Sequence, residues 1–260
     1  MIMIKVGIFG SEGRMGKDIF SRSNFFNNIK IVYLCEDKSH KGLGKKRENL
    51  FVCSEINELI NVSDVIIDFS NAKASLNLLK TVSNSKKKPA IVSGTTGFSS
   101  SQEKKFISLT KGIRILRSFN MSLGVNIMKT LSKISSRNLV DLADVEIFEI
   151  HHNKKKDIPS GTALTLADSI RNGNGKLRKF SFREKSNKKV RTRNEIGFSS
   201  IRGGDIVGEH SVYFFLDGET IKMTHIAHDR KIFSDGALRA SLWISNQKVG
   251  LYSTIDMLDI

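Results

Sequence analysis

Short apolar runs alternate with amphipathic segments through the first 120 residues, and this alternation limits the possible folds more than any other feature. The runs have the length of β-strands and lie at residues 4–9, 30–35, 64–69, 90–93 and 113–117. Segments with helical spacing of apolar residues separate them, near residues 14–21, 55–60, 72–82 and 101–110. Strand–helix alternation of this kind implies right-handed crossovers, which align successive strands in parallel. The pattern therefore predicts an α/β fold with a parallel sheet that is covered by helices on both faces.

A glycine-rich turn follows the first of these strands. Residues 10–16 read GSEGRMG, which places glycines at Gly10, Gly13 and Gly16. Glycine lets the backbone turn tightly beside a pyrophosphate, and the helix start that follows supplies unpaired N–H groups. The next strand ends at Glu36, where a carboxylate can accept hydrogen bonds from an adenosine ribose. A simple strand–helix turn with a surface carboxylate is the alternative, because this glycine spacing is less specific than GxGxxG.

Three further strands also end in small or polar residues. The segments that follow them are Asp68-Phe69-Ser70, Ser93-Gly94-Thr95-Thr96-Gly97-Phe98 and Ser118-Phe119-Asn120-Met121. Ligands of parallel sheets bind at the carboxyl ends of the strands. A single loop of glycine and threonine would indicate little, but several such loops at successive strand ends predict a cofactor cleft.

The pattern changes after residue 121. Ile127, Leu131 and Ile134 indicate a helix of about 14 residues, and an apolar strand follows at residues 145–150. A polar, basic stretch at residues 172–194 suggests a long loop or a hairpin, and three more strands follow at 195–201, 206–216 and 220–227. These elements predict a mixed or antiparallel sheet backed by two helices. We expect the final helix, from residue 235, to pack on the first half, which gives domains of residues 1–121 with 230–260 and of residues 122–229.

The strand at residues 145–150 delivers two adjacent histidines, His151 and His152, to its end. Three lysines follow at 154–156, and Ser160-Gly161-Thr162 then opens a helix. Imidazole and ammonium groups can exchange protons near neutral pH, and a helix start attracts anions. The segment therefore suits a small anionic substrate that is held and protonated. Adjacent histidines on extended backbone point to opposite sides, so ordinary polar contacts are expected here rather than a metal site.

The charge balance allows a further class of function. The chain carries a formal net charge of +16, and residues 176–193 form its densest basic stretch. This stretch contains Phe180 and Phe182 but no RNA-binding signature motif, so a solvated loop is favoured and no nucleic-acid partner is expected. No uncharged apolar run approaches the roughly 18 residues of a membrane span, so no membrane association is expected either. The two cysteines, Cys35 and Cys53, form no CxxC motif, which favours a reducing cytoplasm.

Taken together, the motifs resemble the dihydrodipicolinate reductase family (4-hydroxy-tetrahydrodipicolinate reductases) of lysine and diaminopimelate biosynthesis. The resemblance covers nearly the whole chain and rests on GRMG at 13–16, GTTGF at 94–98, FNMSLGVN at 119–126, EIHHNKKKDIPSGTA at 149–163 and GGDIVGEH at 203–210. It implies a Rossmann-like cofactor domain, plus a smaller α+β domain with a mixed sheet that binds substrate and associates into a homotetramer. It further implies reduction of a cyclic unsaturated dicarboxylate with NADH or NADPH to tetrahydrodipicolinate.

Residue roles follow from the same resemblance. His151 and Lys155 are the expected catalytic pair that handles protons. His152, Gly161 and Thr162 are expected to hold the substrate, chiefly through a carboxylate at the helix start. The residues expected to line the dinucleotide are Gly10, Ser11, Glu12, Gly13, Arg14, Met15, Glu36, Asp37, Gly94, Thr95, Thr96, Ser118, Phe119, Asn120 and Met121.

The chain departs from the family pattern beside Glu36. Asp37 stands where members that use NADPH well often carry arginine, and a carboxylate repels a 2′-phosphate, although Lys38 is adjacent. The Phe69-Ser70-Asn71 segment likewise lacks an arginine that some members carry. Met121 replaces a frequent phenylalanine, a change that should keep an apolar contact with the nicotinamide. We therefore expect a preference for NADH over NADPH.

Overall fold

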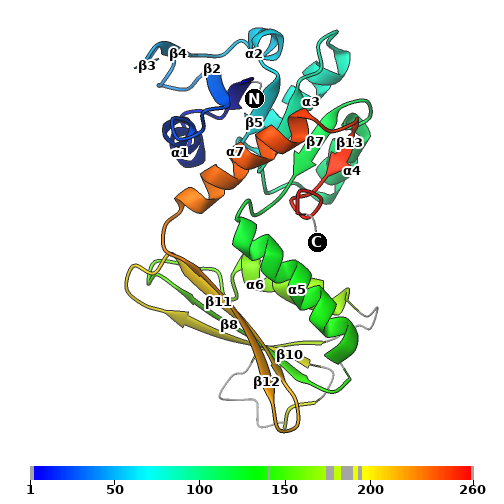
Figure 1. Ribbon diagram of the computed structural model, residues 1–260. Coiled ribbons are helices and arrows are strands. Elements are labelled where there is room, and N and C mark those ends of the chain that lie inside the picture. The colour runs from blue at the N-terminus through cyan, green and yellow to red at the C-terminus, as the bar shows by residue number, and fades with distance from the viewer. Residues whose placement is uncertain (1–2, 140, 174–178, 183–189, 193–194, 259–260) are drawn as a thin grey trace. The chain divides into compact units, whose positions relative to one another are not determined.

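The structure is a computed structural model that describes residues 3–139, 141–173, 179–182, 190–192 and 195–258. The chain divides into two compact units (Figure 1). Unit 1 contains Met1–Ser122 and Lys231–Asp259, and unit 2 contains Leu123–Arg230.

Unit 1 is built on an eight-stranded sheet in the order β13-β7-β6-β5-β1-β2-β4-β3. Its strands are β1 (Ile4–Phe9), β2 (Ile29–Cys35), β3 (Lys46–Arg47), β4 (Leu50–Cys53), β5 (Val65–Asp68), β6 (Ala90–Ser93), β7 (Arg114–Arg117) and β13 (Gly250–Tyr252). All neighbouring strands run parallel except the short pair β3 and β4. The chain moves from β1 outward to β2 on one side and then returns to β5 on the other. This change of direction places a ligand crevice at the carboxyl end of β1.

The helices of unit 1 lie on both faces of the sheet. They are α1 (Arg14–Ser23), α2 (Ile56–Val62), α3 (Ala72–Asn84), α4 (Ser100–Leu109) and α7 (Lys231–Ser245). One buried apolar cluster joins the sheet to α1 and α7 through Ile19 and Leu238, and another joins it to α2, α3 and α4 through Leu59, Leu79 and Phe106. The predicted α/β architecture with a parallel sheet between two helical layers is confirmed.

Unit 2 contains a five-stranded mixed sheet in the order β12-β11-β8-β10-β9. Its strands are β8 (Asp144–His151), β9 (Lys179–Phe182), β10 (Glu195–Arg202), β11 (Gly208–Phe215) and β12 (Thr220–Ala227). The helices α5 (Leu123–Leu139) and α6 (Gly161–Arg171) pack on one face of this sheet (Figure 1). Alternate residues of β8 are buried on that face, from Val145 to His151. The predicted mixed sheet with two helices is confirmed.

Three details differ from the sequence prediction. The strand β9 pairs in parallel with β10, so the described part of residues 172–194 includes a strand, where a loop or a hairpin was expected. The rest of the basic stretch at 176–193, apart from residues 179–182 and 190–192, lies outside the described residues. The apolar row of α5, Ile127, Leu131 and Ile134, is 37–45% exposed, because the buried side of the helix is the one that carries Val125, Met128, Ser132 and Ser136. No described helix has the length and apolar content needed to cross a membrane.

Candidate active site

The glycine turn has the geometry that close approach to a ligand requires. Gly10 has a φ of +83°, and the Gly10 and Ser11 amides donate to the Cys35 carbonyl at 2.9 and 3.1 Å. A Cβ at Gly16 would lie 2.3 Å from the Gly10 carbonyl oxygen, so only glycine lets α1 start this close to the turn. The N-cap of α1 is Gly13, which has no side chain that could cap the helix, and no side-chain cap is present within the described chain. The first amides of α1 therefore lack a side-chain acceptor and suit an anion.

A cleft of about 950 Å³ opens beside this turn, at the carboxyl ends of β1, β2 and β5. Five of the residues predicted to bind the cofactor line it, namely Gly10, Glu12, Gly13, Glu36 and Asp37. Basic side chains contribute most of the remaining charge of its lining: Lys38, Lys73, Lys80 and Lys105. Exposed turn amides, acidic residues at the end of β2 and a basic wall fit a dinucleotide with its ribose hydroxyls and phosphates.

Glu36 has a structural partner in addition to its expected ligand. Its two carboxylate oxygens accept from the Glu12 amide at 2.8 Å and from the Asp37 amide at 3.1 Å. Glu36 therefore fixes the glycine turn against the end of β2. Asp37 accepts from the hydroxyl and the amide of Ser39, and these bonds hold the pKa of the Asp37 carboxyl below its usual range. A negative charge thus stands at the edge of the cleft.

Glu12 has a partner that sequence reasoning did not find. Its side chain is only 3% exposed, and Arg47 on β3 binds both of its oxygens at 3.0 Å. Lys17 approaches the same carboxylate at 3.4 Å. Burial alone would raise the pKa of Glu12, but the bonds and charges of Arg47 and Lys17 outweigh it and lower the pKa. A basic residue in a two-residue strand carries no sequence pattern by which this role could have been recognised.

The other predicted cofactor residues do not line the cleft. Ser11 is buried and lines a smaller cavity of about 400 Å³ beside Arg47. Thr95 is buried, and its hydroxyl bonds to Asp68 and to the Ser70 amide, both at 3.1 Å. Met121 is 2% exposed and packs in the core of unit 1. The remaining members lie on α1 or on the loops after β6 and β7, without a place in the cleft lining: Arg14, Met15, Gly94, Thr96, Ser118, Phe119 and Asn120.

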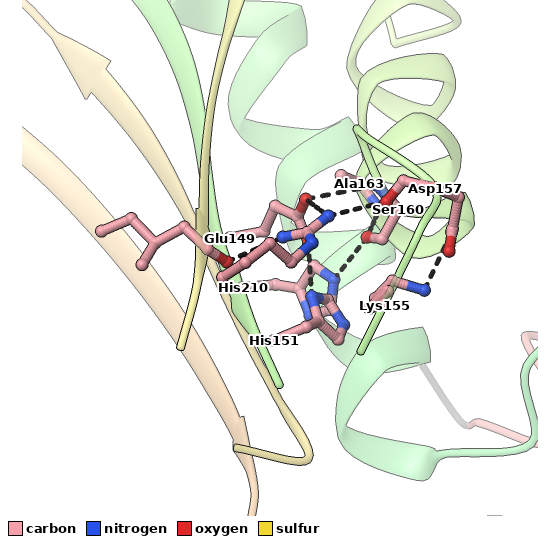
Figure 2. Close-up of polar contacts among 9 residues, drawn as sticks. Glu149, His151, Lys155, Asp157, Ser160, Ala163 and His210 are labelled. Carbon is pink, nitrogen blue, oxygen red and sulfur yellow. Dashed lines mark hydrogen bonds and ion pairs between the residues drawn. The ribbon is translucent and has the colours of Figure 1, made fainter. Parts of the chain in front are cut away.

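The end of β8 carries a buried polar cluster, the histidine cluster, made of Glu149, His151 and His210 (Figure 2). The alternation of β8 places Glu149 and His151 on its helix-covered face, and the β8–β11 register sets His210 opposite Glu149. His151 Nδ1 is in ion-pair contact with Glu149 Oε2. The rings of His151 and His210 meet edge to face, with centroids 5.0 Å apart. Burial, reinforced by the nearby charge of His151, lowers the pKa of His210 to about 3, so this ring is neutral at pH 7.

The start of α6 adjoins the histidine cluster. Ser160 caps the helix by accepting from the Ala163 amide at 3.2 Å, and its hydroxyl lies 2.9 Å from His210 Nε2. At Gly161 a Cβ would meet no atom within 4 Å, so the space beside the helix start is open. Thr162 follows in the first turn of α6, and its side chain is partly exposed.

Lys155 reaches the same region from the loop between β8 and α6. Its Nζ lies 2.8 Å from Asp157 Oδ2 (Figure 2), and this bond lowers the pKa of Asp157. His152 lies outside the histidine cluster, and desolvation together with the charge of Arg230 lowers its pKa. The structure thus brings His151, Lys155 and the start of α6 together within unit 2.

The histidine cluster also has the composition of a metal site. Each member offers a ligand atom, and the three atoms lie within 4.8 Å of one another. However, Arg202 Nη2 already binds Glu149 Oε1 at 2.7 Å, and Ser160 engages His210. Since the guanidinium balances the charge of the buried carboxylate, Glu149 is paired without an ion, and the absence of a metal stays a prediction.

The fold and the cleft define a class of protein. A doubly wound parallel sheet with a glycine turn at the point where strand order reverses is the architecture of dinucleotide-binding domains, and unit 2 adds imidazole and ammonium side chains beside a helix start. The class is that of the NAD(P)H-dependent oxidoreductases. Sequence comparison makes the assignment specific: residues 4–121 match the N-terminal and residues 124–258 the C-terminal region of dihydrodipicolinate reductase. The chain belongs to the dihydrodipicolinate reductase family.

Individual relatives agree with this assignment. The chain is 40% identical over 261 residues to the 4-hydroxy-tetrahydrodipicolinate reductase of Pelagibacter ubique, with 100% of this chain and 99% of the relative covered. It is 39% identical to that of Buchnera aphidicola, with 99% and 98% covered. The solved dihydrodipicolinate reductase of Paenisporosarcina, with dipicolinate bound, superimposes with a TM-score of 0.82 over 99% of this chain and 100% of the other, at 21% identity, which shows the shared fold. The expected family and its NAD(P)H-dependent reductase activity in lysine and diaminopimelate biosynthesis are confirmed.

Proposed function

We propose that the activity is divided between the units, with the dinucleotide bound in the cleft of unit 1 and the substrate protonated by His151 and Lys155 of unit 2. The observation that carries this division is the meeting of both side chains with the start of α6 in one corner of unit 2. The reaction converts a cyclic 4-hydroxy dicarboxylate to tetrahydrodipicolinate with uptake of one hydride and one proton and loss of one water. The reduced nicotinamide, when bound, supplies the hydride with its two electrons.

The protein supplies the proton and holds the dicarboxylate. His151 and Lys155 are the groups that give up the proton, and His152, Gly161 and Thr162 hold a carboxylate at the start of α6. The open space at Gly161 and the positive end of the helix dipole support this placement. The dipicolinate in the Paenisporosarcina structure, a planar dicarboxylate, is consistent with such a ligand.

We infer a preference for NADH over NADPH. The ionised Asp37 at the cleft edge disfavours a 2′-phosphate, and Lys38 is drawn to Glu55 at 3.7 Å. We also propose that the dinucleotide extends beyond the cleft lining to the sequence-predicted residues of the loops after β6 and β7. The preference is tested by comparing kcat/KM for NADH and NADPH at low and moderate salt. Equal values for the two cofactors would remove it.

We also infer that the chain forms a homotetramer through unit 2. The face of the sheet opposite α5 and α6 carries a row of three isoleucines and one glutamate, with Ile201, Ile150, Glu209 and Ile226 on β10, β8, β11 and β12. Ile201 and Ile226 are 47% and 48% exposed, as expected for a face that another copy covers. Light scattering after gel filtration tests this assembly state, and a monomer at micromolar concentration would contradict it.

The two free cysteines support the expected location in a reducing cytoplasm.

The catalytic assignment is tested by single variants. His151→Ala and Lys155→Ala should each lower kcat by about 10²- to 10⁴-fold, the usual contribution of a positioned proton donor. The Kd for NADH, measured by fluorescence titration, should hardly change, because the cleft belongs to unit 1. Lys154→Ala is the matched control, since Lys154 is an exposed neighbour on the same loop. Near-normal turnover of either test variant would remove that residue from the mechanism.

A further inference from the structure

Glu149 is a carboxylate buried completely inside unit 2, with 0% exposure. A buried charge is costly unless it is paired and hydrogen-bonded. Its Oε1 accepts from Arg202 Nη2 at 2.7 Å and from the Ser160 amide at 3.3 Å, and its Oε2 faces His151 Nδ1. Burial tends to raise the pKa of Glu149, but the contacts with His151 and Arg202 outweigh it and hold the pKa well below the usual range. Glu149 is therefore an ionised group throughout the physiological range.

This arrangement determines which atom of His151 is open to a ligand. With Nδ1 facing a carboxylate, the neutral ring carries its proton on Nδ1. The other ring nitrogen, Nε2, faces the first residue of β11, where a Cβ added to Gly208 would lie only 3.0 Å away. A side chain at this position would cover Nε2. The ring of His151 is thus oriented with Nδ1 held by Glu149 and with Nε2 on the side of Gly208.

The ion pair of Glu149 and Arg202 also contacts the loop that carries Lys155. Arg202 Nη2 donates to the Asp157 carbonyl at 2.7 Å in addition to Glu149. The Ser160 amide, at the far end of the loop, donates to Glu149. Two points of the loop are therefore attached to one buried pair. Among the described residues, the side chain of Lys155 pairs with Asp157 of the same loop.

We propose that Glu149 and Arg202 form a positioning pair that orients His151. Through the Asp157 carbonyl and the Ser160 amide, the pair also holds the Lys155 loop in a fixed position relative to His151. Neither residue needs to touch the substrate. The inference deepens the proposed roles of His151 and Lys155 and rests on them. The inference gives the buried pair of Glu149 and Arg202 a role in catalysis. Stability alone does not account for the pair, because buried ion pairs contribute little net stability compared with apolar packing.

The test compares Glu149→Gln with Glu146→Gln. Glu146 is a matched control, because it lies on the same strand and binds Arg191 at 2.7 Å, but it faces the opposite side of the sheet. Glu149→Gln should lower kcat on the order of 10²-fold, with the Kd for NADH unchanged. The pH profile of kcat should also change, because His151 Nδ1 loses the carboxylate that it faces. Glu146→Gln should leave kcat and the profile unchanged.

Variants of Arg202 separate positioning from simple charge. Arg202→Lys should retain more activity than Arg202→Met, since it keeps the charge beside Glu149. Trypsin should cleave the 154–156 segment faster in Arg202→Met than in the native chain, because the Asp157 carbonyl loses its anchor. A Glu149→Gln variant with native kcat and native pH profile would overturn the proposal. Activity that is lost with a chelator and restored by zinc would also overturn it, since the cluster would then be a metal site.

A measurement on the unaltered chain guards against variants that fail to fold. Long-range ¹H–¹⁵N spectra report which nitrogen of a histidine carries the proton, and the proposal requires the Nδ1–H form in neutral His151. An Nε2–H form would overturn it. The proposed function fails differently: if His151→Ala retained normal turnover, the catalytic assignment would fall whatever Glu149 does. Inactive His151→Ala with fully active Glu149→Gln would refute the positioning pair alone.

Discussion

Replacing Gly16 by alanine tests whether the glycine turn is built for close approach of α1. The added Cβ would lie 2.3 Å from the Gly10 carbonyl oxygen and 2.7 Å from the Ser11 Cα. Real Cβ atoms essentially never come closer than 3.0 Å, so one of the two backbones must move by at least the difference between 3.0 and 2.3 Å. Both contacts are to backbone, so no side chain can rotate away to relieve them. The helix must therefore shift away from the turn.

The magnitude follows from two opposing effects. Overpacking of a tight contact costs about 1–3 kcal/mol, and the better helix propensity of alanine returns at most about 1 kcal/mol. A net loss of about 1–2 kcal/mol should lower the Tm by roughly 2–8 °C for a unit of this size. The turn amides would also be displaced. Since a hydrogen bond to a charged group is worth about 1.5–3 kcal/mol, the Kd for NADH should rise by roughly ten- to a hundredfold.

Gly13→Ala serves as the control. Its Cβ would lie 3.3 Å from the same Gly10 oxygen, a contact that a small adjustment relieves. Circular dichroism melting and a fluorescence titration with NADH measure both quantities in the two variants. If Gly16→Ala kept the native Tm and the native Kd, or if Gly13→Ala were the more damaging change, the close-approach argument would be refuted.

The remaining predictions concern unit 2. Thr162→Val should mainly raise the KM for the dicarboxylate, measured in steady-state assays, and an unchanged KM would argue against a carboxylate site at the start of α6. Gly208→Val should lower kcat/KM by at least tenfold without weakening NADH binding, because its side chain would cover His151 Nε2. For His210, whose folded pKa of about 3 lies below the ordinary 6.5, the unfolded chain takes up the proton first, so stability falls as the pH drops from about 6.5 toward 3. His210→Gln should flatten the dependence of Tm on pH in that window, and an equally steep dependence would contradict this.

Local pattern was sufficient to predict the principal elements of the fold. The strands β1 and β6 coincide with their predicted ranges, because apolar runs between helical segments leave little choice of structure. The strands β3, β4 and β13 were missed. β3 is a basic pair, β13 has three residues, and β4 follows β3 without the intervening helix that marks the other strands. The orientation of α5 was not predictable either. Ile127, Leu131 and Ile134 are 37–45% exposed, whereas Val125, Met128, Ser132 and Ser136 are buried, and the buried side is decided by packing within unit 2.

The candidate site was predictable where it is continuous in sequence and not where it depends on strand pairing. The run from Glu149 to Thr162 identified His151 and Lys155 as one group. Arg202 is 53 residues from Glu149, and only the parallel pairing of β10 with β8 brings the two together. Register between strands is set by whole-sheet packing, so no local pattern indicates such a partner.

The arrangement of β8 explains why the site needs this distant partner. Its first buried residues, Val145 and Ile147, belong to the apolar core of unit 2, and its last two, Glu149 and His151, are the site. His151 is therefore fixed by a strand that the core already holds, and sites on strands are more precise than sites on loops. Lys155 stands on a loop and has no such support from the core. A proton donor misplaced by about 1 Å can lose as much as 10² in rate. In the mechanism we propose, the contact of Arg202 with the Asp157 carbonyl therefore links the sheet to the loop and keeps Lys155 in place relative to His151.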